Sequence, residues 1–367
     1  MPMNRVQFQA GMSMPEFFDR YGSEAQCAAA LAAQRWPLGF RCPRCVCAEH
    51  YVVGHGARKL YQCRACRHQT SVTAGTLMDS SKLPVRTWFL AMYLICQAKT
   101  GLSALALMRQ LGTSYRSAWL MHQKLMRAMA QRDSELPLTG HVQLDDAYLG
   151  GERPDVVGRG SPNKVPIVAA VSTNDAGHPM RVKLSPVAAF TKKAITDWAR
   201  VNLMPGCDVR SDGLNCFAGV IDAGCAHSYI VVGKRKPRDL PQFTWVNTVL
   251  GNLKTMIGGA HKSFNFGKYA SQYLGAFCYR FNRRFDLRQL AADLVGHAAT
   301  SPPVRERFIR GLAELHDESG RRLNNDHGSS CDRTGCQTRS AIRTLVAGRR
   351  RGFFHRHRHV HAGWPWH

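Results

Sequence analysis

The sequence predicts an α/β protein in which a metal-binding module and a helical region precede a larger α/β core. Three observations predict this class. Two Cys-x-x-Cys units lie near the N-terminus, a helical apolar pattern follows them, and from residue 140 the pattern changes to apolar runs of strand length. At 367 residues the chain can hold two or three domains, one of them with a sizeable core.

The composition indicates a polyanionic partner. The chain has a net charge of +25 and an isoelectric point near 10.0. A nucleic acid is the natural partner of such a chain, although ribosomal and membrane-surface proteins are also basic. The longest apolar run, Trp88 to Cys96, is too short to cross a bilayer, and the N-terminus has no secretory signal pattern. We therefore expect a soluble, cytoplasmic protein without a membrane partner.

Residues 13–36 are predicted to form a helical lead-in. Ser23 can cap a helix, and Gln26 stands three residues later in the capping-box position. Pro37 and Gly39 then stop the helical pattern. The segment shows no feature beyond a structural one.

The cysteine spacing predicts a zinc ribbon in residues 37–75. Each Cys-x-x-Cys turn lets two thiolates converge on one ion, and the seventeen residues between the turns suit a hairpin. Four ligands close the zinc shell, so the ion would fold the module and not catalyse. The predicted ligands are Cys42, Cys45, Cys63 and Cys66, and the rivals that break the two-pair symmetry are Cys47, His55 and His68. Arg58 and Lys59 lie in this module and are expected to contact DNA.

Residues 82–130 are predicted to form two or three helices that resemble a helix-turn-helix. Two stretches with apolar residues at three- and four-residue spacing are joined by a glycine-containing turn, residues 112–114. In the helix after this turn, Arg116 and Lys124 are expected to point outward and contact DNA. Its methionine-rich face is expected to be core. The alternative is an ordinary helical hairpin that packs between domains.

Residues 140–290 are predicted to form a core with the element order of ribonuclease-H-like folds. Three strands, a helix and two further strands follow one another, at residues 141–151, 164–172, 178–187, 191–203, 207–214 and 227–232. Such folds place one carboxylate on the first strand, one on the fourth strand and a third polar ligand on a later helix. Asp145, Asp212 and Asn247 occupy these places.

Asp146 is the rival of Asp145, because adjacent residues of a strand face opposite sides. Val142 and Leu144 share a face with Asp146, whereas Asp145 shares the other face with Gln143. This alternation favours Asp145 as the residue that faces the metal.

Asn247 and Lys254 would lie on one stripe of a helix, because seven residues are close to two helical turns. Gly258 and Gly259 are expected to end this helix, so His261 need not continue the stripe. The helix would then carry both a metal ligand and a phosphate-binding cation.

Phosphodiester cleavage and transfer need one oxygen to be activated and another to be stabilised as it leaves, and two divalent ions can do both. Magnesium prefers oxygen ligands. Asp145 would bridge both ions, Asp212 would hold one, and Asn247 would supply a neutral carbonyl oxygen. Lys254 would hold the scissile phosphate or its neighbour. These four residues are the predicted catalytic set.

The YRFNRR stretch at residues 279–284 interleaves aromatic rings with guanidinium groups, a mixture suited to phosphates and base faces. We therefore expect Arg280, Arg283 and Arg284, together with His261, to contact DNA. His227 and His261 are also candidates for proton transfer, although each is more often a structural hydrogen-bonding residue.

Several motifs together resemble the zinc-ribbon-bearing DDE-type transposases of bacterial insertion sequences, in the group with an ISXO-like transposase domain. They are RWPLGFRCPRC, YQCRACRHQTSVTAGT, SAWLMHQKLMRAM, LDDAYLGG, RSDGLNCF, WVNTVLGNLKTMIGGAH and YRFNRRFDL. The resemblance implies binding of an element's terminal inverted repeats, then DNA strand cleavage and strand transfer with Mg²⁺ or Mn²⁺. It carries the catalytic set onto Asp145, Asp212, Asn247 and Lys254, with asparagine as a variant of the third position.

The resemblance also implies a nucleoid-associated protein that works on target DNA as a homo-oligomer in a synaptic complex. Residues 291–316 would be the helical end of the core. Residues 317–367 have ten arginines and no lysine, and we expect either a disordered tail or a stretch translated through a frameshift or a lost stop codon. A DNA-binding tail and a metal-binding histidine tract are the alternatives there. For the whole chain, the alternatives are a non-catalytic DNA-binding regulator derived from a transposase and a structure-specific nuclease or resolvase.

Overall fold

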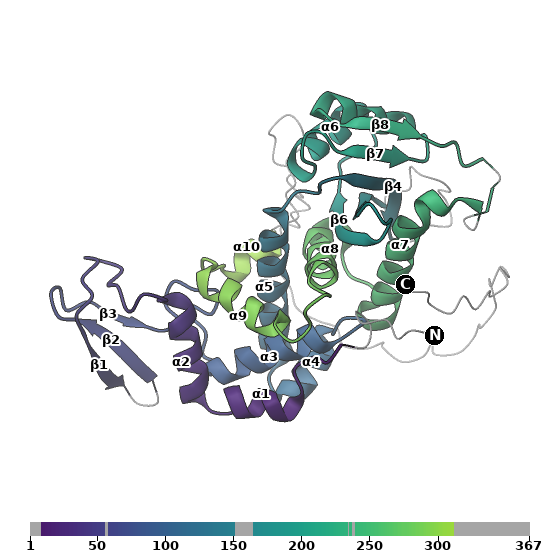
Figure 1. Cartoon of the computed structure of the whole chain (residues 1–367). Coiled ribbons are helices and arrows are strands. Elements are labelled where there is room, and N and C mark those ends of the chain that lie inside the picture. Colours follow the sequence, from purple (N-terminus) through teal and green to yellow (C-terminus); the bar gives the residue numbers. More distant parts are fainter. Residues whose placement is uncertain (1–8, 56–57, 151–163, 234, 237–238, 312–367) are drawn as a thin grey trace, which may run out of the picture. The chain divides into compact units, whose positions relative to one another are not determined.

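The computed structural model of the chain describes residues 9–55, 58–150, 164–233, 235–236 and 239–311, except for the side chains of residues 55 and 58 (Figure 1). The predicted tail, residues 317–367, lies outside this part. All elements named below belong to one compact unit. None of the described helices is both long and apolar enough to cross a membrane.

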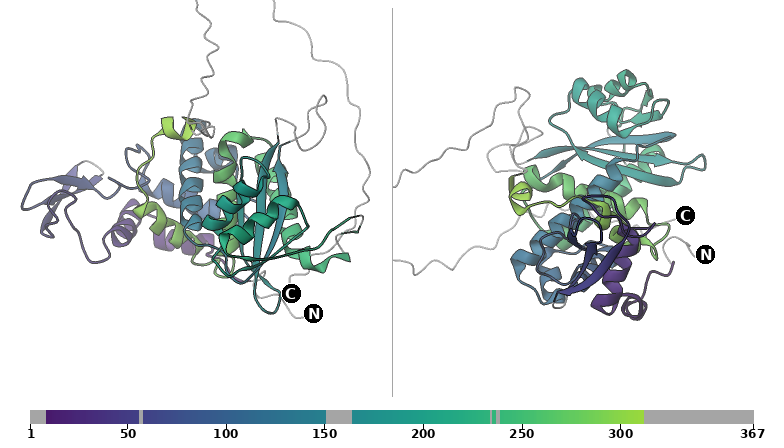
Figure 2. Two further views of the ribbon diagram at one scale, coloured as in Figure 1. Left: turned by 90° about the horizontal axis from the view of Figure 1, so that it is seen from above. Right: turned by 90° about the vertical axis from the view of Figure 1, so that its left-hand side faces the viewer.

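The predicted zinc ribbon contains a three-stranded antiparallel sheet in the order β1-β2-β3, which is separate from the larger sheet of the chain (Figure 2). Its strands are β1 (His50–His55), β2 (Arg58–Cys63) and β3 (Gln69–Ser71). The pairing of β1 with β2 runs from His50 opposite Cys63 to His55 opposite Arg58, which confirms the predicted hairpin between the two Cys-x-x-Cys units.

The two Cys-x-x-Cys turns have the same backbone geometry. The amide of Cys42 donates to the carbonyl of Cys47 at 3.0 Å, and the amide of Cys63 donates to that of His68 at 2.9 Å. The residue after each second cysteine has a positive φ: 61° at position 46 and 57° at position 67. A repeated local turn therefore points both cysteine pairs toward a common centre.

Val46→Gly is expected to stabilise the zinc ribbon by about 1 kcal/mol, because a β-branched residue pays a steric cost in the left-handed region that glycine avoids. Little burial is lost, since Val46 is 69% exposed. Guanidinium unfolding of the zinc-loaded protein measures the change. Arg67→Gly, at the equivalent position of the second turn, should act in the same direction. A lower stability of Val46→Gly would contradict the prediction.

The helical region is built around one hydrophobic cluster. It comprises α1 (Met14–Tyr21), α2 (Glu24–Arg35), α3 (Val85–Gln97), α4 (Ala104–Leu111), α5 (Tyr115–Ser134), α9 (Leu290–Thr300) and α10 (Glu306–Gly311). All of these helices except α10 contribute buried residues to the cluster. The predicted capping box of Ser23 and Gln26 is present at the start of α2. Gly112 ends α4 in the left-handed conformation with φ 62°, and Ser114 caps α5, as the helix-turn-helix prediction requires.

Two further expectations about this region have different outcomes. The methionine-rich face of α5 is core, since Met121, Met126 and Met129 are buried in the cluster. The segment after residue 290, however, does not end the sheet-containing core. Leu290 and Leu294 of α9 pack in the helical cluster against α2, α3 and α5. The apolar face of α9 packs into the cluster formed by the N-terminal helices. The chain therefore returns to these helices after the sheet-containing core.

The core contains a five-stranded mixed sheet in the order β6-β5-β4-β7-β8. Its strands are β4 (His141–Leu149), β5 (Val165–Thr173), β6 (Pro179–Pro186), β7 (Asp208–Ser211) and β8 (Ala226–Tyr229). The pairs β4–β5 and β5–β6 are antiparallel, whereas β4–β7 and β7–β8 are parallel. This order confirms the predicted α/β class with a ribonuclease-H-like core.

Helices cover both faces of this sheet (Figure 1). One hydrophobic cluster joins the sheet to α6 (Lys192–Asn202) and the 3₁₀ helix η1 (Asn215–Ala223). Another joins the opposite face to α7 (Thr244–Met256) and α8 (Phe266–Asn282). A short 3₁₀ helix, η3 (Pro241–Phe243), leads into α7, and a π-helical turn, η4 (Ile257–His261), follows it. The α-helix thus ends just before the two glycines, but the glycines do not end the helical backbone, which continues through them to His261.

Candidate active site

Three carboxylates meet where β4 and β7 run side by side. The last paired residues of these parallel strands are Leu144 and Ser211, so Asp145 and Asp212 are the next residue on each. Oxygen atoms of Asp145, Asp146 and Asp212 all lie within 4.8 Å of one another, and all three residues are half-buried. The structure therefore brings the two predicted acids together and adds a third.

The position of Asp146 differs from the simplest expectation of strand alternation. Val142 and Leu144 are buried against the α6 face, as predicted for the face that Asp146 shares. The carboxylate of Asp146 nevertheless reaches the same cluster as that of Asp145, whose Oδ1 accepts the amide of Asp146 at 2.9 Å. The two side chains are thus expected to leave the strand on opposite sides, but their carboxylate oxygens still lie within 4.8 Å of one another.

The turn after Asp212 is tightly held. Asp212 Oδ1 accepts the amide of Leu214 at 3.1 Å, and Gly213 has a φ of 90°. The Oγ of Ser211, just before Asp212, lies 2.9 Å from Nε2 of His227. Burial lowers the pKa of His227. These contacts place His227 as a structural partner beside the acids, which agrees with the structural alternative for this histidine.

Gly213→Ala is expected to weaken metal binding at the acids. An alanine at position 213 would have a strained positive φ, and its Cβ would lie 3.3 Å from Cδ2 of Tyr229. The turn that orients Asp212 would therefore shift. Gly206→Ala is the matched control, because Gly206 has a φ of 87° with open space around it and precedes the other end of β7. Both variants should lose about 1–2 kcal/mol of stability.

Only Gly213→Ala should raise the dissociation constant for Mn²⁺, measured by electron paramagnetic resonance of free Mn²⁺. Equal Mn²⁺ affinities in the two variants would show that the turn does not orient a metal ligand.

Helix α7 carries the other two predicted catalytic residues. Asn247 lies in its first turn and Lys254 in its last, and both are exposed. The opposite face of the helix is buried through Val246, Val249, Leu250 and Leu253. The predicted stripe is therefore present. At the start of the helix, Oε1 of Gln143 from β4 accepts the amides of Trp245 and Val246, both at 3.1 Å.

Lys124, expected to point outward, is buried. It is 7% exposed, and its Nζ donates to the carbonyl of Leu77 at 3.2 Å and lies 5.9 Å from the centre of the Trp88 ring. Burial lowers its pKa. The outward prediction is wrong because α5 is covered on several sides, by α3, α8 and α9. Lys124 therefore lies inside the helical cluster and is not placed to reach a phosphate.

The arginines of the YRFNRR stretch have partners inside the protein. Arg280 donates to the carbonyl of Ala98 at 2.7 Å, and burial lowers its pKa. Arg283 lies 3.8 Å from the centre of the Tyr279 ring. Arg284 stacks on Phe281 and Phe285 and donates to the carbonyls of residues 179 and 180. These positions give no support to the DNA contacts predicted for the three guanidinium groups.

A buried carboxylate explains part of this arrangement. Asp133, whose side chain is 3% exposed, lies 3.5 Å from Arg283 and 3.7 Å from Arg181. It also accepts two hydrogen bonds of 3.0 Å from the side-chain Nδ2 of Asn282, while Lys183 donates to its backbone carbonyl. Asp133 thereby joins the end of α5 to β6 and α8. Asp133 was not among the residues predicted from the sequence.

His261 also faces the protein interior. Its ring packs edge-on against Tyr273 at 4.7 Å and lies 5.9 Å from that of His122. Burial and the nearby Arg280 lower the pKa of His261 to about 4, so it is neutral near pH 7. A structural role thus fits the position of His261 better than a charged phosphate contact.

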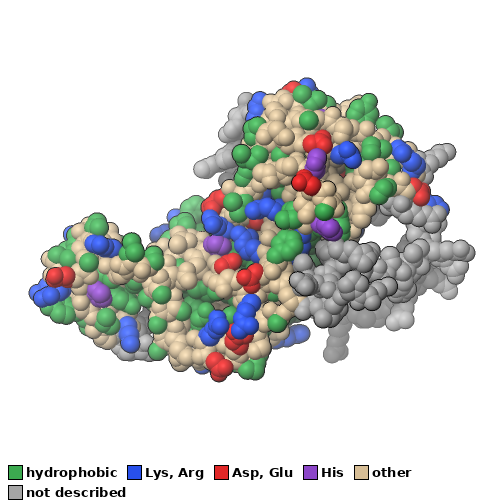
Figure 3. All heavy atoms as spheres, in the orientation of Figure 1, with side chains coloured by type: hydrophobic (Ala, Val, Ile, Leu, Met, Phe, Trp, Pro, Cys, Tyr) green, Lys and Arg blue, Asp and Glu red, His purple; other side chains and the backbone are tan. Residues whose placement is uncertain are grey.

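Other residues predicted to bind DNA are exposed. Lys59 and Lys254 are exposed, and the side chain of Arg116 is 77% exposed and pairs with Glu306 at 2.9 Å. Such a surface pair contributes little, so the guanidinium can exchange its partner for a phosphate. The side chain of Arg58 lies outside the described residues. On the face shown in Figure 3, Lys and Arg side chains are spread over much of the surface.

The four predicted zinc ligands form a second cluster. Sulfur atoms of Cys42, Cys45, Cys63 and Cys66 lie within 4.8 Å of one another. Cys42 Sγ is 3.6 Å from Cys66 Sγ, and Cys45 Sγ is 3.5 Å from Cys63 Sγ. A tetrahedral zinc–thiolate site with Zn–S bonds of about 2.3 Å has S–S edges of about 3.8 Å. The four thiols therefore fit zinc, and the rivals Cys47 and His68 lie outside this group among the described residues.

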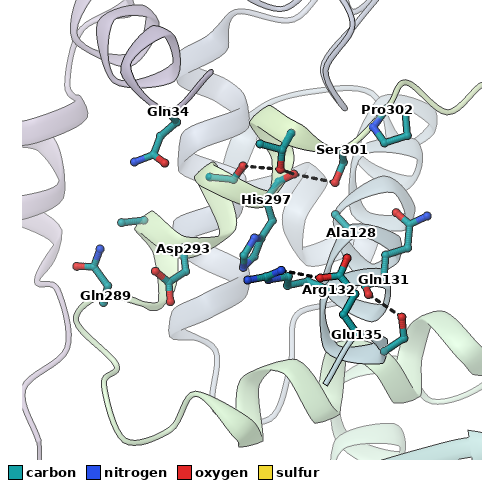
Figure 4. Close-up of a pocket in the computed structure, with 14 residues that line it drawn as sticks. Gln34, Ala128, Gln131, Arg132, Glu135, Gln289, Asp293, His297, Ser301 and Pro302 are labelled. Carbon is teal, nitrogen blue, oxygen red and sulfur yellow. Dashed lines mark hydrogen bonds and ion pairs between the residues drawn. The ribbon is translucent and has the colours of Figure 1, made fainter. Parts of the chain in front are cut away.

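A cavity of about 690 Å³ lies elsewhere, between α2, α5 and α9 (Figure 4). Gln34, Asp293 and His297 are among its lining side chains, and Arg132 there pairs with Glu135 at 2.6 Å. None of the predicted catalytic residues lines it. The acidic cluster thus remains the candidate active site.

Comparisons with known proteins agree with this geometry. Residues 137–282 match the model of the ISXO2-like transposase domain, and residues 22–69 match that of the transposase zinc-ribbon domain. The chain is also 30% identical over 131 residues to an uncharacterized protein in transposable element ISH50 of Halobacterium salinarum. That match covers 35% of this chain and 42% of the relative, less than half of its length. With both domains in order, the chain belongs to the zinc-ribbon transposases with an ISXO2-like transposase domain.

Proposed function

We propose that this transposase binds the terminal inverted repeats of a DNA element and catalyses metal-dependent strand cleavage and strand transfer. The observation that carries the proposal is the cluster of Asp145, Asp146 and Asp212, formed by the central strand β4 and the carboxyl end of the neighbouring strand β7 in a ribonuclease-H-like sheet. Carboxylates held this close repel one another unless a cation neutralises them. A divalent metal site fits this arrangement within a transposase domain.

The donor atoms suit Mg²⁺ or Mn²⁺, because both prefer oxygen ligands. Asp145 and Asp212 would supply carboxylate oxygens, and Asn247 would supply a neutral carbonyl oxygen from α7. When bound, such ions make a hydroxyl group nucleophilic near neutral pH and offset the charge that develops at phosphorus. Lys254 would hold a neighbouring phosphate as a point charge on the same exposed stripe.

The DNA contacts are assigned to exposed groups. The zinc ribbon with Lys59 and the helix-turn-helix-like pair α4–α5 with Arg116 would contact the element ends, and the net charge of +25 would favour their association with DNA. Two DNA ends have to be brought together before strand transfer, so the working form would be a homo-oligomer that also holds target DNA.

The test uses the full zinc-loaded chain with a labelled duplex that carries the ends of the element. With Mg²⁺ or Mn²⁺ we expect nicks at the element ends and joined products, which disappear without metal and in Asp145→Asn. Binding of the ends without nicking under either metal would favour the non-catalytic regulator. Equal cleavage of branched DNA that lacks the end sequence would favour a structure-specific nuclease.

A further inference from the structure

Helix α7 has no side-chain cap from its own flanking sequence. The first amides of an α-helix have no partner within the helix and need an acceptor from elsewhere. Phe243 occupies the N-cap position of α7 and offers no side-chain hydrogen bond. By contrast, α6 on the opposite face of the sheet is capped locally, since the Oγ1 of Thr191 accepts the amide of Ala194 at 3.2 Å.

The missing acceptor comes from β4. Oε1 of Gln143 accepts the amides of Trp245 and Val246 at 3.1 Å each, across 102 and 103 residues of sequence. The indole of Trp245 also donates to the carbonyl of Gly177 at 2.6 Å, which ties the same turn to the β5–β6 connection. The start of α7 is thus held at two points of the sheet.

The position of this acceptor relates it to the candidate active site. Gln143 and Asp145 are two residues apart on β4 and therefore share a face of the sheet. The two capped amides belong to the residues immediately before Asn247. One side chain thus connects the strand of the first acid to the helical turn of the third predicted ligand.

We propose that Gln143 is a positioning residue that holds the start of α7 against β4, so that Asn247 and Asp145 can serve one metal site. This rests on the proposed function, which gives those two residues their metal role. A neutral amide suits the position, because it caps the helix without adding a further negative charge beside three carboxylates.

Gln143→Met tests the proposal, since it keeps the length of the side chain and removes the acceptor. In the zinc-loaded full chain, hydrogen exchange at the amides of Trp245 and Val246 should become roughly fivefold faster, as expected for loss of a helix cap. The dissociation constant for Mn²⁺ should rise about tenfold, because groups that orient metal ligands commonly have effects of this size. Gln143→Glu retains acceptor oxygens and should keep the slow exchange.

Thr191→Val is the matched control, because it removes the cap of α6 with little change of shape. It should speed exchange at Ala194 and leave the affinity for Mn²⁺ unchanged. An unchanged Mn²⁺ affinity in Gln143→Met, or fast exchange at the α7 amides in Gln143→Glu, would overturn the positioning role. Mn²⁺ binding by the wild type that Asp212→Asn does not reduce would instead refute the proposed metal site.

Discussion

Replacing Asp145 or Asp212 by asparagine is expected to lower the rate of metal-dependent DNA cleavage by about a thousandfold or more. A carboxylate that holds a catalytic metal contributes several kcal/mol to the transition state, and about 4 kcal/mol corresponds to this factor. Asp146→Asn should cost only about tenfold, because strand alternation directs its side chain toward the face that Val142 and Leu144 share, and it would act mainly through its charge. Single-turnover cleavage of a labelled element end at saturating Mg²⁺ measures all three.

The stability of these variants separates catalysis from folding. Each substitution removes one negative charge from three carboxylates within 4.8 Å, so the melting temperature measured without divalent metal should not fall. Binding of the element ends should also persist. If Asp146→Asn loses more activity than Asp145→Asn, Asp146 is the ligand on β4 and the alternation argument fails.

Removal of zinc is expected to unfold the ribbon, residues 37–75, while the five-stranded sheet remains folded. The buried core of the ribbon is small, with Phe40, Cys42 and Cys63 at its centre. It cannot supply the stability that structural zinc provides, about 10–16 kcal/mol of binding free energy in zinc-finger peptides. Cys63→Ser should therefore lose the bound zinc and the protection of the β1–β2 amides from hydrogen exchange. Binding to the element ends should weaken with them.

Cys47→Ser is the control for this prediction. Cys47 lies in the same module, but its sulfur is outside the four-cysteine cluster, 3.9 Å from the carbonyl of Glu49. This variant should keep one zinc per chain, measured by inductively coupled plasma mass spectrometry. Loss of zinc from Cys47→Ser, or its retention in Cys63→Ser, would contradict the assigned ligand set.

The YRFNRR stretch shows where reasoning from composition fails. Arginines between aromatic residues suit nucleic acids, but stacking and ion pairing also stabilise a protein interior. The carboxylate paired with Arg283 is Asp133, 150 residues earlier in the chain. Nothing in the local sequence connects the two, so the pattern alone could not distinguish a DNA-binding surface from a structural junction.

Local spacing was sufficient for much of the protein. Two Cys-x-x-Cys turns predicted the zinc ribbon, because each turn brings its own two thiolates together. Apolar periodicity predicted the helices and strands in order, and the element order predicted that Asp145 on the first strand would lie near Asp212 at the end of the fourth, two strands that pair in parallel. The stripe of Asn247 and Lys254 follows from helical geometry alone.

Packing between distant elements decided the rest. The burial of Lys124, the approach of Asp146 to the acidic cluster and the cap that Gln143 places on α7 all depend on how helices and strands meet. Gln143 left one signal in the sequence, a polar residue on the same strand face as Asp145, but its partner is 102 residues away. Sequence periodicity describes one element at a time, whereas these contacts exist only after elements distant in sequence have packed together.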